Sequence, residues 1–134
     1  MSETALQQLK YTKTHEWVRL EGASATVGIT DHAQQEISDV VFIELPKPGR
    51  AVKQGEEIAV VESVKAAFSI YAPVSGTVAR ANDALAKDPS LINRSPYGEG
   101  WIFSLQSANA EEAQRLFSYP EYQAWVSGKE KESH

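Results

Sequence analysis

The sequence contains no cysteine and no long hydrophobic run. The lack of cysteine excludes disulfides, thiolate nucleophiles, thiolate-bound metals and iron–sulfur clusters. No apolar stretch approaches the roughly 20 residues that a membrane-spanning helix needs. A formal net charge of −5 argues against nucleic-acid binding, which depends on cationic residues that neutralise phosphates. We therefore expect neither a membrane nor a nucleic acid among the partners.

Motifs for catalysis and metal binding are also missing. The three histidines, His15, His32 and His134, do not share the spacing of metal ligands on one helix. Zinc needs three or four converging ligands, so we expect no metal site. The role of His15, beside Glu16 and Trp17, stays open. No Gly-x-Ser-x-Gly elbow or glycine-rich phosphate loop occurs, so the sequence predicts a protein that is not an enzyme.

The composition fits one globular domain spanning residues 1–134. The hydrophobic fraction of 42% and the charged fraction of 23% are ordinary for such a domain. A chain of this length buries roughly two thirds of its unfolded surface, enough for a core without disulfides. Residues 1–5 have neither the basic region and apolar core of a secretion signal nor the arginines of a transit peptide. We therefore expect a cytoplasmic protein of bacterial type.

Short β-prone runs separated by glycine and proline turns dominate the chain. The predicted strands cover residues 17–20, 25–29, 40–45, 58–63, 67–72, 77–79 and 101–105. The strand at 77–79 is expected to continue the meander begun by the two strands before it. Residues 82–99 show no regular period. The pattern predicts a mainly β sandwich or barrel with helical additions.

Helices are predicted on both sides of this β-rich region. They comprise about one turn within residues 1–13, a helix over 32–37 capped by Thr30 or Asp31, one opened by a capping box of Asn109 and Glu112, and one from Pro120 to about Gly128. Leu116 and Phe117 are expected to face inward. Residues 129–134 are expected to form a frayed tail.

One lysine stands at the tip of a predicted hairpin. Residues 58–63 and 67–72 are strands that meet at a tight turn containing Lys65. Because Val64 and Ala66 carry no charge, they leave the ammonium group without an adjacent ionic partner, and the hairpin is expected to hold it away from the body of the protein. Glu62 is expected near the base of the turn. This arrangement presents a single amine for covalent modification.

The segment around this lysine resembles the lipoylation segment of the glycine cleavage system H-protein family. The matching motifs occur in family order at residues 15–18 (HEWV), 27–34 (VGITDHAQ), 41–46 (VFIELP), 62–66 (ESVKA), 70–76 (IYAPVSG), 91–93 (LIN) and 96–101 (PYGEGW). The resemblance covers residues 10–127. It implies a mainly β, lipoyl-domain-like hybrid of barrel and sandwich, with short N-terminal and C-terminal helices.

The resemblance also implies a function and a cofactor. Lys65 would carry covalent lipoate, attached by a lipoate ligase or an octanoyl/lipoyl transferase that recognises Glu62, Ser63, Val64 and Ala66. The carrier would take an aminomethyl group from glycine decarboxylase (P protein) to a tetrahydrofolate-dependent aminomethyltransferase (T protein). Dihydrolipoyl dehydrogenase (L protein) would then reoxidise the arm. A tethered arm makes each transfer effectively intramolecular. A monomer is expected, because the partners must reach Lys65 in turn.

Family members are thought to protect the loaded arm in a surface cleft. The resemblance implies that Glu16 lines this cleft, with Thr14 and His32 on neighbouring segments and Ser69 as a further cleft residue. At positions 68 and 69, relatives commonly have serine followed by an acid, whereas this chain has Phe68 and Ser69. The loss of the acid removes one candidate clamp on the amine.

A second departure from the family lies before the strand at 40–45. Ser38 replaces the glycine that commonly precedes the aspartate there.

Three alternatives remain at this stage. A related carrier that passes lipoate to other complexes, or serves a separate redox partner, would keep Lys65 while relaxing the cleft. A biotin carrier is disfavoured because biotinyl domains typically flank their lysine with methionines, and the only methionine here is Met1. An unmodified β-rich interaction module is disfavoured, because it would not explain why Glu62 and Lys65 of the lipoylation motif are both present.

Overall fold

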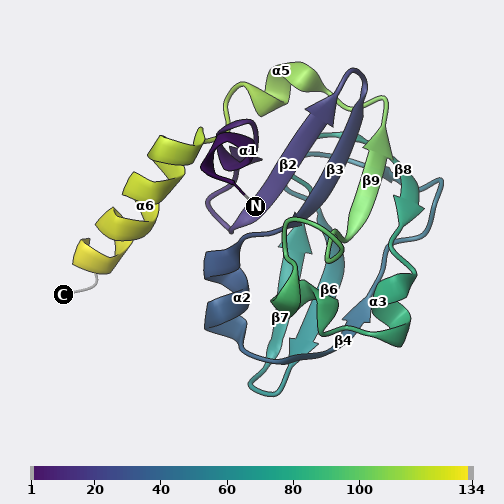
Figure 1. Cartoon of the computed structure of the whole chain (residues 1–134). Coiled ribbons are helices and arrows are strands. Elements are labelled where there is room, and N and C mark those ends of the chain that lie inside the picture. Colours follow the sequence, from purple (N-terminus) through teal and green to yellow (C-terminus); the bar gives the residue numbers. More distant parts are fainter. Residues whose placement is uncertain (1, 133–134) are drawn as a thin grey trace.

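A computed structural model describes residues 2–132 of the chain as a mainly β fold (Figure 1). The strands are β1 (Lys10–Tyr11), β2 (Glu16–Glu21), β3 (Ser24–Ile29), β4 (Val40–Glu44), β5 (Ala51–Val52), β6 (Glu57–Ser63), β7 (Ala67–Tyr71), β8 (Gly76–Ala81) and β9 (Phe103–Gln106). Each predicted strand is confirmed to within about two residues at its ends. The two-residue strands β1 and β5 were not predicted.

The strands within residues 2–132 form two sheets that enclose the main core. The larger sheet has the order β1-β2-β3-β9-β8-β5 and the smaller the order β4-β6-β7, all with antiparallel pairing. Buried residues of the larger sheet, such as Val27 and Phe103, belong to the same core as Val61 and Ile70 of the smaller one. The open two-sheet arrangement confirms the predicted barrel-sandwich fold.

Short helices connect and flank the strands. They are α1 (Glu3–Gln7), α2 (Asp31–Ile37), α3 (Ala84–Lys87), α4 (Leu91–Arg94), α5 (Ala110–Ala113) and α6 (Tyr119–Glu132). The Thr30 side chain accepts a hydrogen bond from the Ala33 N–H and is therefore the N-cap of α2. None of the helices within residues 2–132 is long and apolar enough to cross a membrane.

Several local predictions were wrong because packing overrides local pattern. Strand β8 does not extend the β6–β7 meander; it crosses to the larger sheet and pairs with β5 and β9. Residues 82–99, expected to be irregular, contain α3 and α4. The predicted capping box does not close: Asn109 caps α5, but the Glu112 carboxylate accepts hydrogen bonds from the Ser75 N–H and hydroxyl.

The C-terminal helix is longer than predicted. It extends to Glu132, past the expected end near Gly128. Positions 133 and 134 of the expected frayed tail lie outside the described residues. The first part of α6 packs against α1 and β1, and the rest projects from the sheets (Figure 1). The buried Tyr122 of α6 joins a second small core with Leu9, Tyr11 and Trp17. This packing supplies stability that the helix pattern alone does not reveal.

Leu116 and Phe117 are each half-buried and pack against the cores, Leu116 on the main one and Phe117 on the second. Their predicted inward orientation is thus confirmed.

Trp17 anchors the larger sheet close to the site. The indole is fully buried, and its N–H donates to the Pro96 carbonyl at 3.0 Å. Across the β2–β3 pair, a Cβ at Gly28 would lie 2.7 Å from the indole ring. Glycine is therefore required at position 28, because any side chain would displace Trp17 and the segment of β2 that begins with Glu16.

Candidate lysine hairpin and adjoining groove

Lys65 lies at the tip of the β6–β7 hairpin, as predicted. The last paired residues of the hairpin are Glu62 and Ala67. Ser63 shapes the turn, because its hydroxyl oxygen accepts hydrogen bonds from the Lys65 N–H at 3.1 Å and the Ala66 N–H at 3.3 Å. A backbone bond of 2.9 Å from the Ser63 N–H to the Ala66 carbonyl closes the turn. The serine therefore fixes the backbone that presents the lysine.

The lysine side chain does not point away from the protein, so that expectation was wrong. Its ammonium group donates to the Glu36 carbonyl at 2.9 Å, in the last turn of α2. The hairpin tip is itself held by a bond of 3.0 Å from the Val64 N–H to the Asp39 carbonyl. Carbonyls in the last turn of a helix lack intrahelical partners and carry partial negative charge, so they attract a cation. Lys65 nevertheless remains exposed.

Exposed apolar side chains surround the hairpin. Among the residues whose burial is described, the exposed large hydrophobic ones are Val41, Phe42 and Val64. Phe42 of β4 pairs with Glu62, at the base of the turn. Glu62 and Ala66 are exposed as well. Apolar side chains gathered at one exposed edge are typical of a surface that binds another protein.

A groove runs beside the hairpin, with a volume of about 190 Å³. It is lined by Thr14, His15, Ile29, Ala33, Glu36, Ile37, Phe68, Ser69 and Ile70. Thr14 and Ser69 line it as expected, and His15, whose role the sequence left open, lines it too. His32 does not line this groove and faces a neighbouring one. The Ser69 hydroxyl is engaged by the Glu57 carboxylate.

Glu16 does not line the groove, which corrects its expected place there. Its side chain is fully buried, and its carboxylate accepts hydrogen bonds from the hydroxyls of Thr12 and Thr14, both at 2.5 Å. The other carboxylate oxygen accepts from the Tyr71 N–H at 3.1 Å. Burial raises the pKa of the Glu16 carboxyl, although these hydrogen bonds oppose the shift. Glu16 thus joins the 12–14 segment to β7 and positions Thr14 from below.

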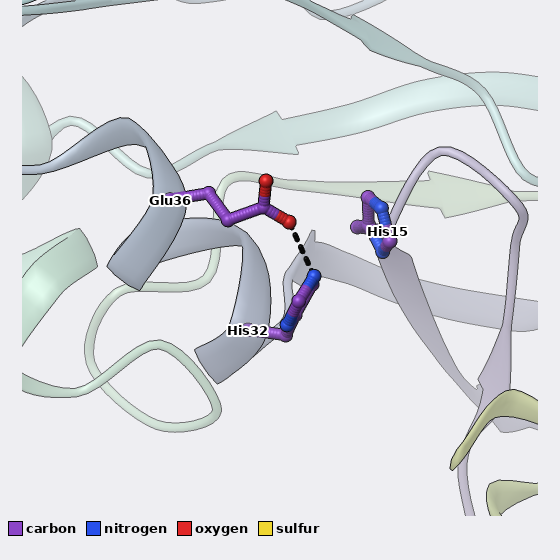
Figure 2. A group of neighbouring side chains, drawn as sticks. All are labelled: His15, His32 and Glu36. Carbon is purple, nitrogen blue, oxygen red and sulfur yellow. Dashed lines mark ion pairs between the residues drawn. The ribbon is translucent and has the colours of Figure 1, made fainter. Parts of the chain in front are cut away.

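His15 and Glu36, which both line this groove, converge with His32 (Figure 2). His32 and Glu36 lie one turn apart on α2 and form an ion pair, while His15 comes from the segment before β2. The two imidazole rings are 4.9 Å apart between centroids. The spacing of His32 and Glu36 is visible in the sequence, but nothing local indicates that His15 would join them.

Ser38 adopts an unusual backbone conformation between α2 and β4. Its φ of 67° and ψ of −154° lie in a region that is essentially restricted to glycine. The resemblance described in the sequence analysis implies glycine at this position. Serine is therefore held here with backbone strain, between Glu36 and Asp39, whose carbonyls contact the hairpin tip.

Comparisons of the sequence with known proteins identify one family. The family model described as "Glycine cleavage H-protein" matches residues 9–129. The glycine cleavage system H protein of Methylacidiphilum infernorum is 53% identical over 90% of this chain and 94% of its own length. That of Thermotoga maritima is 49% identical over 91% of this chain and 98% of its own length.

A solved structure is also similar. The crystal structure of a glycine cleavage system H protein from Mycobacterium marinum superimposes with a TM-score of 0.79 at 35% identity, covering 91% of this chain and 98% of that chain. These likenesses favour a lipoyl carrier of glycine cleavage over the alternative of a lipoyl donor for other complexes. The chain belongs to the glycine cleavage H-protein family, whose members act as carriers and not as enzymes.

Proposed function

We propose that Lys65 carries a covalent lipoyl group and that the adjoining groove shelters the loaded arm. The observation that carries the proposal is the position of the Lys65 amine, exposed at a hairpin tip and 2.9 Å from the carbonyl of Glu36, a residue that lines the groove. An arm attached at this amine begins at the edge of the groove. Amide formation removes the charge of the lysine and leaves a long flexible stem.

The surface around Lys65 suits recognition by a modifying enzyme. Ser63 fixes the turn through its two hydrogen bonds, while Glu62, Val64 and Ala66 are exposed on either side of the amine. The exposed Val41 and Phe42 extend this surface along β4. We assign it to docking of a lipoate ligase or an octanoyl/lipoyl transferase.

The groove fits an aliphatic arm with a polar end. Ala33, Ile37, Phe68 and Ile70 offer apolar surface, and the hydroxyl of Thr14 lies among them. When bound, the lipoyl group would supply a disulfide that takes up the aminomethyl group of glycine. The apolar lining would shield that group from water, and the Thr14 hydroxyl would contact its polar end. Glu16 acts indirectly by fixing Thr14, since it is buried beneath the groove.

Other expected groove residues contribute less directly. Ser69 lines the groove, but its hydroxyl contacts Glu57, and His32 stands beside the groove in an ion pair with Glu36. With Ser69 in place of the acid common in relatives, this groove offers one carboxylate fewer to a loaded amine. We therefore expect the arm to be held mainly by apolar contacts and by Thr14.

The partners implied by this role are the glycine decarboxylase, the aminomethyltransferase and the dihydrolipoyl dehydrogenase of the glycine cleavage system. Each partner must reach the same exposed hairpin. We therefore propose that the chain is a monomer that binds its partners one at a time. It also keeps the cytoplasmic location expected from the sequence.

The test is mass spectrometry of the protein expressed with lipoate available. Trypsin does not cleave after an acylated lysine, so modification predicts one fused peptide from Gln54 to Arg80 that carries the lipoyl increment. Lys65→Arg should abolish the increment, whereas Lys53→Arg, at another exposed turn lysine, should retain it. An unmodified Lys65 in cells with an active lipoylation pathway would refute the proposal.

A second measurement tests the partner assignment. Lipoylated protein incubated with purified glycine decarboxylase and glycine labelled at Cα should acquire the label on the arm, because decarboxylation releases only the carboxyl carbon. A lipoylated carrier from another complex serves as the control. If the two proteins are labelled at the same rate, a dedicated role in glycine cleavage is contradicted.

A further inference from the structure

We propose that His15, His32 and Glu36 form a binding site for a divalent transition metal of the zinc type, at the end of the groove beside Lys65. The proposal goes beyond the carrier role and does not depend on lipoylation. Each of the three side chains offers one ligand atom, and these atoms all lie within 4.8 Å of one another. Figure 2 shows His15 across from α2, the helix that carries His32 and Glu36.

Side-chain movement is needed to convert the observed arrangement into a tetrahedral site. A tetrahedral zinc ion with ligands at about 2.1 Å holds neighbouring ligand atoms about 3.4 Å apart. His32 and Glu36 are already in contact on one face of α2. Their side chains are 30% and 61% exposed, so side-chain rotations can close the remaining gap to His15.

The orientation of His15 is fixed by a second layer of hydrogen bonds. Its Nδ1 lies 2.7 Å from the hydroxyl oxygen of the buried Tyr122, which in turn lies 2.7 Å from the Thr30 hydroxyl. Thr30 is held as the N-cap of α2. Histidines that bind metals almost always use one ring nitrogen for the metal and the other for such a partner. Because Nδ1 contacts the Tyr122 hydroxyl, we assign the metal to the other ring nitrogen of His15, Nε2.

The ligand set selects the class of metal. Two imidazoles and one carboxylate suit Zn²⁺ and its neighbours such as Co²⁺ and Ni²⁺, whereas Mg²⁺ and Ca²⁺ require oxygen ligands. Three protein ligands leave a fourth tetrahedral position open. Since His15 and Glu36 both line the groove, this open position faces the groove. A bound metal would also tie α2, on which the Lys65 amine rests, to the segment before β2.

The experiment is a zinc titration of the full-length, untagged protein after treatment with EDTA. We expect one saturable Zn²⁺ site in competition with a chromophoric chelator, and no comparable binding of Mg²⁺. His15→Gln, His32→Gln and Glu36→Gln should each lower the affinity at least tenfold. His134→Gln, which removes the third histidine of the sequence, should leave the affinity unchanged.

Two further measurements separate ligation from folding. Tyr122→Phe keeps the ring and removes only the hydroxyl, so it should weaken zinc binding about tenfold or more by releasing His15. Co²⁺ should give the intense visible absorption of a tetrahedral ion in the wild type and lose it in His15→Gln. Circular dichroism of the metal-free variants checks that they fold. The proposal is overturned if no single saturable site is found, or if the three ligand variants bind zinc as tightly as the wild type.

Discussion

Replacing Ser38 with glycine is expected to stabilise the protein. Ser38 holds a φ of 67° and a ψ of −154°, a conformation that costs a residue with a Cβ about 1–3 kcal/mol. Glycine relieves this strain but loses about 0.4–1 kcal/mol more through its greater freedom in the unfolded chain. The net gain in the free energy of unfolding should therefore be about 1 kcal/mol.

The hydrogen bonds of residue 38 should be unaffected by the change, so any gain in stability can be attributed to the backbone conformation. The Ser38 N–H donates to the Gln34 carbonyl at 3.1 Å, and the Ser38 carbonyl accepts from the Asn93 side-chain amide at 2.8 Å. Both bonds use the backbone of residue 38 and persist in the glycine variant. Asn93 also accepts from the Val40 N–H at 2.9 Å, so the conformation is held on both sides.

Urea unfolding followed by tryptophan fluorescence measures the effect, with an unchanged slope as the check on two-state behaviour. Ser38→Ala is the matched control: it removes the hydroxyl but keeps the Cβ, so it should not stabilise. Ser24→Gly, at an exposed strand position without positive φ, should be destabilising. If Ser38→Gly is no more stable than the wild type, or Ser38→Ala is equally stabilising, the argument from backbone strain fails.

Other predictions concern buried and crowded positions. Glu16→Ala should lower the unfolding free energy by about 3–5 kcal/mol, since two hydroxyls and a backbone N–H lose their acceptor. Burial raises the pKa of Glu16 above 4.5 in the folded state, so the free energy of unfolding of the wild type should fall as pH rises from 4.5 through that raised pKa. EDTA keeps the protein free of metal during this measurement. The Glu16→Gln variant should lose this pH dependence. Gly100→Ala should cost about 1–3 kcal/mol, because its Cβ would lie 2.5 Å from a backbone carbonyl oxygen, whereas Gly128→Ala, with open space around it, should not destabilise. Ser69→Asp should lower the free energy of unfolding by about 0.5–1 kcal/mol, because it places a second carboxylate against Glu57. Adding Glu57→Gln to this variant should remove that loss. Thermal unfolding measures these variants and the two glycine variants.

Local sequence patterns were sufficient to predict most strands of this protein and the turn that carries Lys65. Short β-prone runs bounded by glycine and proline predicted the strands, and the runs on either side of Lys65 predicted a lysine at a hairpin tip. Thr30 was a predicted cap of α2, and the structure confirms it. These features depend on residues a few positions apart, so local propensity and turn chemistry suffice to predict them.

Contacts between distant segments could be seen only in the folded structure. It placed β8 in the larger sheet, where the strand pairs with β5 and β9 and its Val78 joins the core between the two sheets. It lengthened α6, whose early turns pack against α1 and β1. Pairings of this kind depend on the closure of long loops and on shared burial, and no local pattern encodes them.

The same distinction holds at the candidate site. The sequence identified Lys65 and the neighbouring residues, but only the fold placed the amine on the Glu36 carbonyl. It buried Glu16 beneath the groove and carried His15 to the face of α2 that bears His32. Side chains far apart along the chain become one site only when the sheets that bear them are packed together, so a site of this kind follows from the core and not from spacing.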